Sequence, residues 1–346
     1  MFMKRMRRMG FLALIMLILA SMPFAVYAAD GQIKIAQTSN TSFPIIIDQP
    51  GSYVLTSNLK VETSGTIAIK IDTDNVVLDL NGHTIQCTRS SGTGISVSGK
   101  YNISIKNGTI SGFGNGVYLY TYTNDDLGGG RLIENIHVRL NGIYGILAYY
   151  TTIINCSAER NTTGMQVHYS NLKNCSANHN SGFGIKADYS SLTNCTATGN
   201  GNIGFNVSLC SLTNCTSSHN KLHGIYGWGS LLNCTSTHNG DDTHTIARGI
   251  YFAGGTITSC FTTRNKSDGI YASGATVVNC VVRENGGDGI ETLNSLIKGC
   301  NVRGNSGVGI KSSNSTDDSY IYGNRSYANG GGDYGFSTNC KHFNNF

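Results

Sequence analysis

The sequence predicts an all-β fold in which a single chain winds into a parallel β-helix, and three regularities support this prediction. The first is a glycine followed by a large apolar residue, which returns about every 20 residues. The pair recurs at Gly145-Ile146, Gly184-Ile185, Gly204-Phe205, Gly224-Ile225, Gly249-Ile250, Gly269-Ile270, Gly289-Ile290, Gly309-Ile310 and Gly335-Phe336. A constant period indicates one supersecondary unit stacked many times, here about 12 coils between Ile67 and Cys340.

Cysteines form the second regularity, in phase with the glycines. The ladder consists of Cys156, Cys175, Cys195, Cys215, Cys234, Cys260, Cys280 and Cys300. Side chains at the same phase of neighbouring coils point the same way, about 4.8 Å apart, whereas a disulfide needs converging Cβ atoms about 3.5–4.5 Å apart. We therefore predict a buried stack of free thiols, with occasional disulfides as the alternative. No C-x-x-C pair occurs, so no metal site is predicted there.

The third regularity is the composition. All three prolines (Pro23, Pro44 and Pro50) lie in the first 50 residues, as expected if the remaining backbone is paired on both sides. Charged residues make up 13% of the chain, against roughly 25% in ordinary domains. Asparagines precede most of the ladder cysteines, and we expect them to adopt a left-handed turn conformation and to bond to one another along the axis.

Each repeat unit contains short β-branched runs rather than a helical pattern. In the unit from Gly269 to Asp288, glycine, serine and asparagine interrupt every run before it reaches the length of a helix. Within each run apolar residues alternate with polar ones, so alternate side chains share one face. Because equivalent residues recur at the same phase, a chain that coils over itself fits better than a hairpin meander.

The first coils also resemble a known family. The segment Asn75-Val-Val-Leu-Asp79-Leu-Asn81-Gly82-His83-Thr-Ile85, with Pro50 to Leu55 before it and Ile103 to Ile110 after it, is similar to the right-handed parallel β-helix repeat proteins of the pectin-lyase-like superfamily, of the bacterial exported type. The resemblance covers residues 44 to about 340 and implies a single-stranded right-handed parallel β-helix, to which we assign residues 66–346. It implies little about activity, since this fold carries lyases, hydrolases, epimerases and non-enzymes.

The amino-terminal segments have other predicted roles. Residues 1–28 are typical of a secretory signal peptide, with four basic residues followed by a short apolar run and Val26-Tyr27-Ala28 at the cleavage site. Its removal lowers the formal net charge from +5 to +1, so the chain offers no basic stripe for nucleic acid. We predict a secreted or periplasmic protein without a membrane anchor. Residues 29–65 lack the repeat phase and are predicted to cap the first coil.

Outward-facing residues predict a ligand surface. If the residue after each repeat glycine points inward, the next residue and the one two further on point outward. This places Tyr226, Tyr251 and Tyr271 in a row with the only tryptophan, Trp228, beside them. Aromatic faces with polar edges suit sugar rings, so we predict a polysaccharide or surface glycan as the partner. Ordinary β-propensity of exposed tyrosine is the alternative.

A group of charged residues next to this row is the first candidate for catalysis. Asp268, Asp288 and Glu291 are expected to converge, with Arg248 one coil earlier. When two carboxylates lie about 5 Å apart, the pKa of one is raised, and such an acid–base pair serves glycoside hydrolysis. The same cluster could instead bind calcium. A third interpretation is that these are solvated aspartates in turns. An insertion brings in Asp241 and Asp242. Gly240-Asp241-Asp242 resembles the paired aspartates of polygalacturonases, although the other motifs of that family are missing.

Lys186 and Asp188, with His168 one coil earlier, form a second candidate site. A base beside an acidic side chain suits β-elimination on a uronic acid. Asp79 and His83 belong to the first-coil motif and are assigned a structural role. Tyr334-Gly335-Phe336 resembles the tripeptide of alginate epimerases, but Ser337-Thr338-Asn339 replaces the Asp-Pro-His that follows it there, which counts against an epimerase.

Two functions are consistent with these observations. The first is an exported enzyme, a hydrolase or lyase, that binds and cleaves a pectin- or uronate-like polysaccharide. The second is a non-catalytic surface or matrix protein that binds glycans through the same face. The aromatic row and the charged cluster favour the enzyme, whereas the incomplete catalytic motifs and the short turns favour the non-catalytic protein. No cofactor is predicted with certainty, and calcium remains open.

Overall fold

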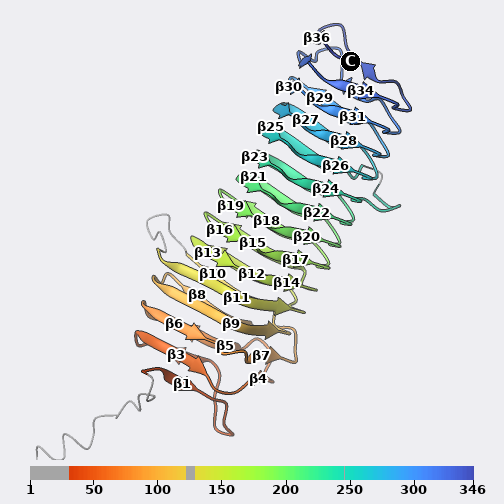
Figure 1. The fold of residues 1–346 in the computed structure, drawn as a ribbon. Coiled ribbons are helices and arrows are strands. Elements are labelled where there is room, and N and C mark those ends of the chain that lie inside the picture. The colour runs from red at the N-terminus through yellow and green to blue at the C-terminus, as the bar shows by residue number, and fades with distance from the viewer. Residues whose placement is uncertain (1–30, 122–128, 245) are drawn as a thin grey trace, which may run out of the picture.

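The computed structural model describes residues 31–121, 129–244 and 246–346, which form one parallel β-solenoid of about 15 turns (Figure 1). All the strand pairings in these residues are parallel, and the strands of successive turns lie side by side along the axis. The described residues include no helix, and so none long and apolar enough to cross a membrane. The predicted signal peptide lies outside the described residues, as does most of the insertion between Thr121 and Gly130.

Strands stack into three sheets, which we name A, B and C. Sheet A contains β2 (Ile45–Ile47), β5 (Ile67–Ile71), β8 (Thr93–Ser98), β10 (Asn115–Tyr120), β12 (Tyr144–Tyr149), β15 (Thr163–His168), β18 (Ile185–Asp188), β29 (Ile290–Leu293), β32 (Ile310–Ser312) and β35 (Tyr334–Gly335). Four long strands continue from sheet A into sheet B: β21 (Phe205–Thr213), β23 (Ile225–Leu232), β25 (Ile250–Thr258) and β27 (Ile270–Val278).

The other two sheets complete each turn. Sheet B contains β1 (Ile33–Ile35), β3 (Gly51–Leu55), β6 (Val76–Asp79), β13 (Thr151–Ile154), β16 (Asn171–Lys173), β19 (Ser191–Thr193), β30 (Leu296–Lys298), β33 (Tyr320–Tyr322) and β36 (Lys341–Phe343). β9 (Ile103–Ser111) and β11 (Arg131–Arg139) join sheets B and C. Sheet C contains β4 (Leu59–Val61), β7 (Thr84–Cys87), β14 (Ser157–Glu159), β17 (Ser176–Asn178), β20 (Thr196–Thr198), β22 (Thr216–Ser218), β24 (Thr235–Thr237), β26 (Phe261–Thr263), β28 (Val281–Arg283), β31 (Asn301–Arg303) and β34 (Arg325–Tyr327).

The solenoid begins earlier than the sequence period indicates. Residues 33–61, assigned to a cap, form β1 to β4, which pair in register with later turns: Ile33 with Tyr53, Ile45 with Ile69 and Leu59 with Ile85. The next steps, from Tyr53 to Leu78 and from Leu78 to Ile105, are longer than the later repeat. The 20-residue period therefore does not extend through these turns, and the predicted number of coils, about 12, was too low.

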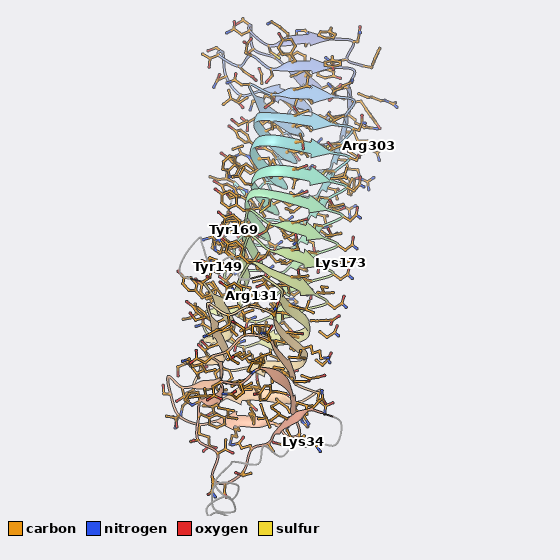
Figure 2. The ribbon with its side chains drawn as sticks, turned by 90° about the vertical axis from the view of Figure 1, so that its left-hand side faces the viewer. Lys34, Arg131, Tyr149, Tyr169, Lys173 and Arg303 are labelled. Carbon is orange, nitrogen blue, oxygen red and sulfur yellow. The ribbon has the colours of Figure 1, made fainter. Side chains whose placement is uncertain are left out.

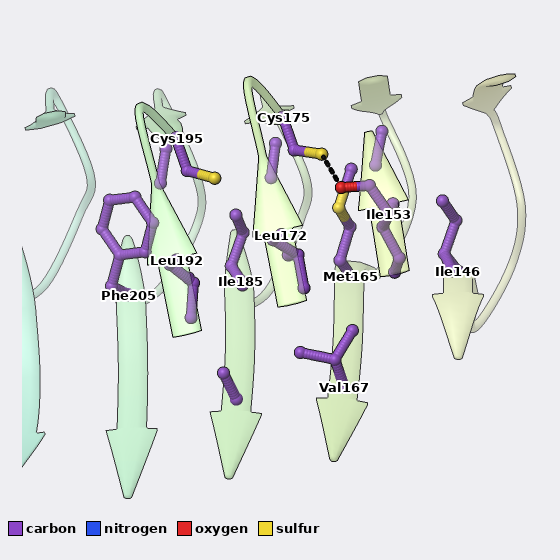
Figure 3. Packing of buried hydrophobic residues seen from close by; sticks show 14 of the residues in the cluster. Ile146, Ile153, Met165, Val167, Leu172, Cys175, Ile185, Leu192, Cys195 and Phe205 are labelled. Carbon is purple, nitrogen blue, oxygen red and sulfur yellow. Dashed lines mark hydrogen bonds between the residues drawn. The ribbon is translucent and has the colours of Figure 1, made fainter. Parts of the chain in front are cut away.

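The core is a continuous apolar column inside the three sheets. The residue after each repeat glycine points inward, as predicted, and Ile185, Phe205 and Ile225 are fully buried in successive turns. Figure 3 shows the isoleucine, leucine and cysteine side chains of neighbouring turns packed in rows. Such rows exclude water over the whole length of the solenoid, and their burial is the main favourable term in its stability.

All eleven cysteines are free and buried, which confirms the prediction for the ladder and extends it to the cysteines outside the ladder phase. The ladder thiols donate to backbone carbonyls; Cys175 Sγ, for example, lies 3.4 Å from the Ile153 oxygen (Figure 3). Burial raises the pKa of Cys156 to about 12. Since the thiolate is the reactive form of cysteine, this residue is a packing element and no nucleophile.

Two asparagine ladders run along the axis. The outer ladder is the predicted one: Asn155, Asn174 and Asn194 have φ of 53–55°, and each amide bonds to that of the preceding turn at 3.2 Å. The inner ladder was not predicted. Its members are Asn141, Asn161, Asn180, Asn200, Asn220, Asn239, Asn265, Asn285, Asn305 and Asn329.

Candidate functional site

The outward residues of sheet A align in two columns, as the sequence predicts. In column one, Lys186 lies in register with Asn206, which pairs with Tyr226. The same column continues through Tyr251, Tyr271, Glu291 and Lys311. In column two, His168 pairs with Asp188 and Asp188 with Ser208. The columns bring together side chains about 20 residues apart in sequence and about 4.8 Å apart along the axis.

The three tyrosines of column one form the predicted row, but their ring faces are covered. Tyr226 stacks on Tyr251, and Tyr251 on Tyr271, each with ring centroids 4.8 Å apart. His223 stacks on Tyr226 at 5.5 Å, and the Arg248 guanidinium lies 4.3 Å from the Tyr271 centroid. The row therefore presents ring edges and hydroxyls to a ligand, and the expectation that its ring faces receive sugar rings is wrong.

Trp228, unlike the three tyrosines of column one, is not part of an aromatic stack in the part of the chain that the structure describes. Its side chain is 45% exposed, and its indole Nε1 donates a hydrogen bond of 2.9 Å to the Ser208 hydroxyl in column two. The pairing of β23 changes register on either side of Trp228, between Gly227 and Gly229. Among the described residues Trp228 has no aromatic stacking partner, and its half-exposed indole is oriented by the hydrogen bond to Ser208.

A second aromatic row was not recognised in the sequence. The corner row consists of Tyr150, Tyr169, Tyr189 and Leu209, each one residue after a member of column two. Its tyrosine rings stack at 5.0 and 4.8 Å with interplanar angles of 4° and 9°. Figure 2 shows Tyr149 of column two and Tyr169 of the corner row on the same side of the solenoid, opposite Lys173 and Arg303. The corner row could have been found in the sequence by reading the residue that follows each member of column two.

Arg248 lies at the centre of the predicted carboxylate cluster and changes its chemistry. Its Nε lies 2.8 Å from Asp268 Oδ2 and its second guanidinium nitrogen 3.0 Å from Glu291 Oε2. Asp288 Oδ2 pairs with Lys311 at 2.9 Å. The residues do converge, as predicted, but cations separate the carboxylates. The expected pair of adjacent carboxylates that share a proton does not form.

Backbone hydrogen bonds occupy the second carboxylate oxygen of each of the two aspartates in this cluster. Asp268 Oδ1 accepts from the Asp288 N–H at 2.9 Å, and Asp288 Oδ1 accepts from the Val308 N–H at 2.7 Å. These bonds link three successive turns. The two aspartates, Arg248 and Lys311 therefore have a structural role, which also argues against a hydrolytic acid–base pair and against calcium at this cluster.

Asp241 and Asp242 lie apart from the cluster, on the insertion before Arg248. Hydrogen bonds from Thr243, and then from His244, hold the pKa of Asp241 below its usual range. Asp242 is exposed and pairs with Lys266. Neither aspartate lines the pocket of about 500 Å³ between the insertion and the solenoid, which is formed by Leu222, His223, Thr243, His244, Ile246 and Arg248.

The second predicted site is assembled. His168 Nδ1 lies 3.1 Å from Asp188 Oδ2, and the imidazole stacks on Tyr149 with centroids 4.4 Å apart. The other ring nitrogen, Nε2, lies 3.4 Å from the Gln166 amide nitrogen. Burial lowers the pKa of His168, so that the imidazole is neutral at pH 7. Lys186 stands in column one beside Gln166.

The other motifs have structural roles. Asp79 accepts from the Asn81 N–H at 2.8 Å and pairs with Lys106 at 3.6 Å. The Tyr334 hydroxyl donates to the carbonyls of Asn324 and Phe346 at 3.1 and 3.0 Å. Tyr334 thus closes the last turn, and it lies in β35, at the end of sheet A.

Comparison with known families agrees with this architecture. The family described as "Right handed beta helix region" matches residues 44–209 and 205–326. The chain belongs to this right-handed β-helix family. No curated protein matches the chain.

Solved structures share the fold of this right-handed β-helix protein at low sequence identity. The A-modules of the Azotobacter vinelandii mannuronan C-5 epimerases AlgE6 and AlgE4 are each 18% identical to it, with TM-scores of 0.60 and 0.56. Both alignments cover 86% of this chain, and 90% and 91% of the modules. The receptor-binding tailspike of bacteriophage Det7 is 9% identical, with a TM-score of 0.51 over 79% of this chain and 69% of that one.

Proposed function

We propose that this protein binds a polysaccharide lengthwise along sheet A, between column one and the corner row. Trp228 is the observation that carries the proposal. It offers a half-exposed indole that is held by the Ser208 hydroxyl, on the same strand as Tyr226. A rigid aromatic face next to polar groups suits a pyranose ring, whose apolar face packs on the indole while its hydroxyls form hydrogen bonds.

The charged side chains on sheet A indicate which class of glycan this surface binds. Between Tyr149 and Trp228 the two columns carry one cation, Lys186, and one anion, Asp188. Further along, Arg248 and Lys311 face Asp268, Asp288 and Glu291. The surface is close to electrical balance, which favours a neutral or sparsely charged glycan. A uronate residue fits best with its carboxylate at Lys186.

The fold comparisons agree with a glycan ligand but do not define it. The A. vinelandii proteins are named for an activity on mannuronan. At 18% identity this likeness concerns the fold. The proposal therefore depends on the side chains of sheet A in this chain.

Binding to a glycan array, followed by titration calorimetry on the best ligand, tests the proposal. We expect Trp228→Ala to weaken binding about tenfold, since an aromatic contact of this kind contributes about 1 kcal/mol or more. Tyr320→Ala is the matched control, because Tyr320 is a similarly exposed aromatic residue on sheet B. Equal losses in the two variants, or no binding by the wild type, would contradict the proposal.

A second candidate function is β-elimination on a uronate-containing chain, which the His168–Asp188 pair favours. A neutral imidazole oriented by a carboxylate is equipped to take the proton next to a sugar carboxylate. The electron pair left on that carbon then forms a double bond and expels the glycosidic oxygen. Lys186 would neutralise the substrate carboxylate.

Unsaturated product ends, followed by their ultraviolet absorbance, test this activity. We expect His168→Gln to lower kcat by at least about 100-fold, as for loss of a general base, with little effect on glycan binding. Tyr320→Ala, on sheet B and away from this pair, is the control and should keep most of the activity. New reducing ends without unsaturation in the wild type would instead indicate hydrolysis, and binding without products would leave the non-catalytic function.

A further inference from the structure

The last turns of the solenoid have an unusual interior. Along one inward row, Phe252 is followed in register by Ala272, Thr292 and Ser312. Thr292 and Ser312 are buried. The apolar core thus becomes a hydroxyl-lined one where the chain makes an extra loop, between Ser312 and Tyr320.

Asp317, on this loop, points into the hydroxyl-lined interior. It is 0% exposed. Its Oδ1 accepts hydrogen bonds from the Asn294 N–H at 2.7 Å, the Ser319 N–H at 3.0 Å and the Ser319 hydroxyl. Its Oδ2 is buried and accepts no hydrogen bond from any described residue. Asp317 Oδ1 therefore accepts three hydrogen bonds, whereas Oδ2 accepts none from the described residues.

Basic side chains of the described residues do not compensate this charge. Asp317 is in no ion pair. The nearby surface lysines have other partners, because Lys311 pairs with Asp288 and Lys341 donates to the Tyr320 hydroxyl. A buried carboxylate without a counter-charge is costly, so a positive charge from solution is expected to occupy its free side.

We propose that Asp317 Oδ2 and the surrounding hydroxyl and carbonyl oxygens bind a hard cation, calcium, inside the last turns of the solenoid. The donor set decides the class of ion. In the described residues no three histidine, cysteine or acidic side chains come together to hold a metal, which leaves one carboxylate with neutral oxygens such as those of Thr292 and Ser319. Oxygen-only ligands suit calcium.

This donor set also predicts the affinity and the effect of the ion. A single charged ligand gives a weak site, in the range of about 10⁻⁴–10⁻³ M that is usual for extracellular modules. The ion would tie the loop to the turns on either side, since Asp317 already bonds to Asn294 in one turn and the Ser337 hydroxyl bonds to the Asp317 carbonyl from the next. Calcium would then stabilise the carboxyl-terminal end.

Equilibrium dialysis of the wild-type protein with radioactive calcium tests the site directly, and thermal unfolding with calcium or with chelator tests its effect. We expect one calcium per chain and a Tm at least about 2 °C higher in 10 mM calcium. Hydrogen exchange should slow in β30, β33 and β36 and remain unchanged in β12 to β18. Dialysis that detects no bound calcium would overturn the proposal without any variant.

Asp317→Asn keeps the shape of the side chain and removes its charge, so this variant should lose both the bound calcium and the rise in Tm. Asp318→Asn is the matched control, because Asp318 is the exposed neighbour on the same loop, and it should behave as the wild type. A calcium response that persists in Asp317→Asn, or disappears in Asp318→Asn, would place the ion elsewhere. A variant that is more stable than the wild type at every calcium concentration would show that no bound cation offsets the cost of the buried carboxylate, and would overturn the proposal.

Discussion

At the scale of single residues, cations decide what the acidic side chains of sheet A do. The sequence brings three carboxylates to one place, which is typical of acid–base catalysis, but Arg248 and Lys311 occupy the gaps between them. In contrast, the His168–Asp188 pair has no lysine or arginine inserted in it. The chemically available group on this surface is therefore the histidine.

Replacing Arg248 tests the structural role of the cluster. Arg248→Met leaves Asp268 and Glu291, which are largely buried, without their partner, and we expect a loss of about 2–4 kcal/mol in the free energy of unfolding. The urea midpoint measures this. Arg264→Met is the matched control, because Arg264 makes a similar but exposed bond of 2.9 Å to Glu284; its cost should stay below about 1 kcal/mol. Similar costs in both variants would mean that the cluster has no special structural importance.

At the scale of the repeated element, the inner asparagine ladder is what keeps the turns in register. Asn200 shows the pattern. Its amide donates to Asn220 Oδ1 at 2.8 Å and to the Ala177 carbonyl at 3.0 Å, and its Oδ1 accepts two bonds of 3.0 Å from Asn180. A buried turn needs partners for all its polar groups, and one asparagine per turn supplies them.

Asn200→Ala is therefore expected to cost about 2–4 kcal/mol, because it leaves buried donors and acceptors of two neighbouring turns unsatisfied. Asn194→Gly, in the exposed outer ladder, is the control. Glycine tolerates the φ of 54° at that position, so the change should cost less than about 1 kcal/mol. Denaturant unfolding of both variants measures the difference, and a small effect of Asn200→Ala would show that water replaces the ladder.

At the scale of the whole molecule, stacking turns a linear repeat into parallel columns. The columns of sheet A are long, straight and close to electrical balance, which is the geometry on which an extended chain can lie. The corner row and Trp228 add an apolar margin to one side of these columns. In the last turns, an added loop also brings the carboxylate of Asp317 into the interior of the solenoid.

The repeat in the sequence was enough to predict the fold, the inward and outward faces and the free thiol ladder. It also predicted the alignment of Lys186, Asp188, Tyr226, Tyr251 and Tyr271. These features follow from the 20-residue period of the repeat, which can be read directly from the order of the residues. It did not reveal the first turns, most of whose steps are longer than 20 residues. The inner asparagine ladder, the corner row and the burial of Asp317 were also not predicted.

Tertiary structure alone decided which neighbours meet across turns of unequal length. The insertion between Ser312 and Tyr320 changes the phase, so that the position of Asp317 could not be counted from the repeat. The repeat places Arg248 one turn before Asp268, but it does not show that the guanidinium lies between Asp268 and Glu291. The pairing of Arg248 with Glu291 joins residues 43 positions apart, and ring stacking depends on side-chain angles that no spacing contains. The columns are therefore a product of sequence period, whereas the chemistry available on them is a product of packing.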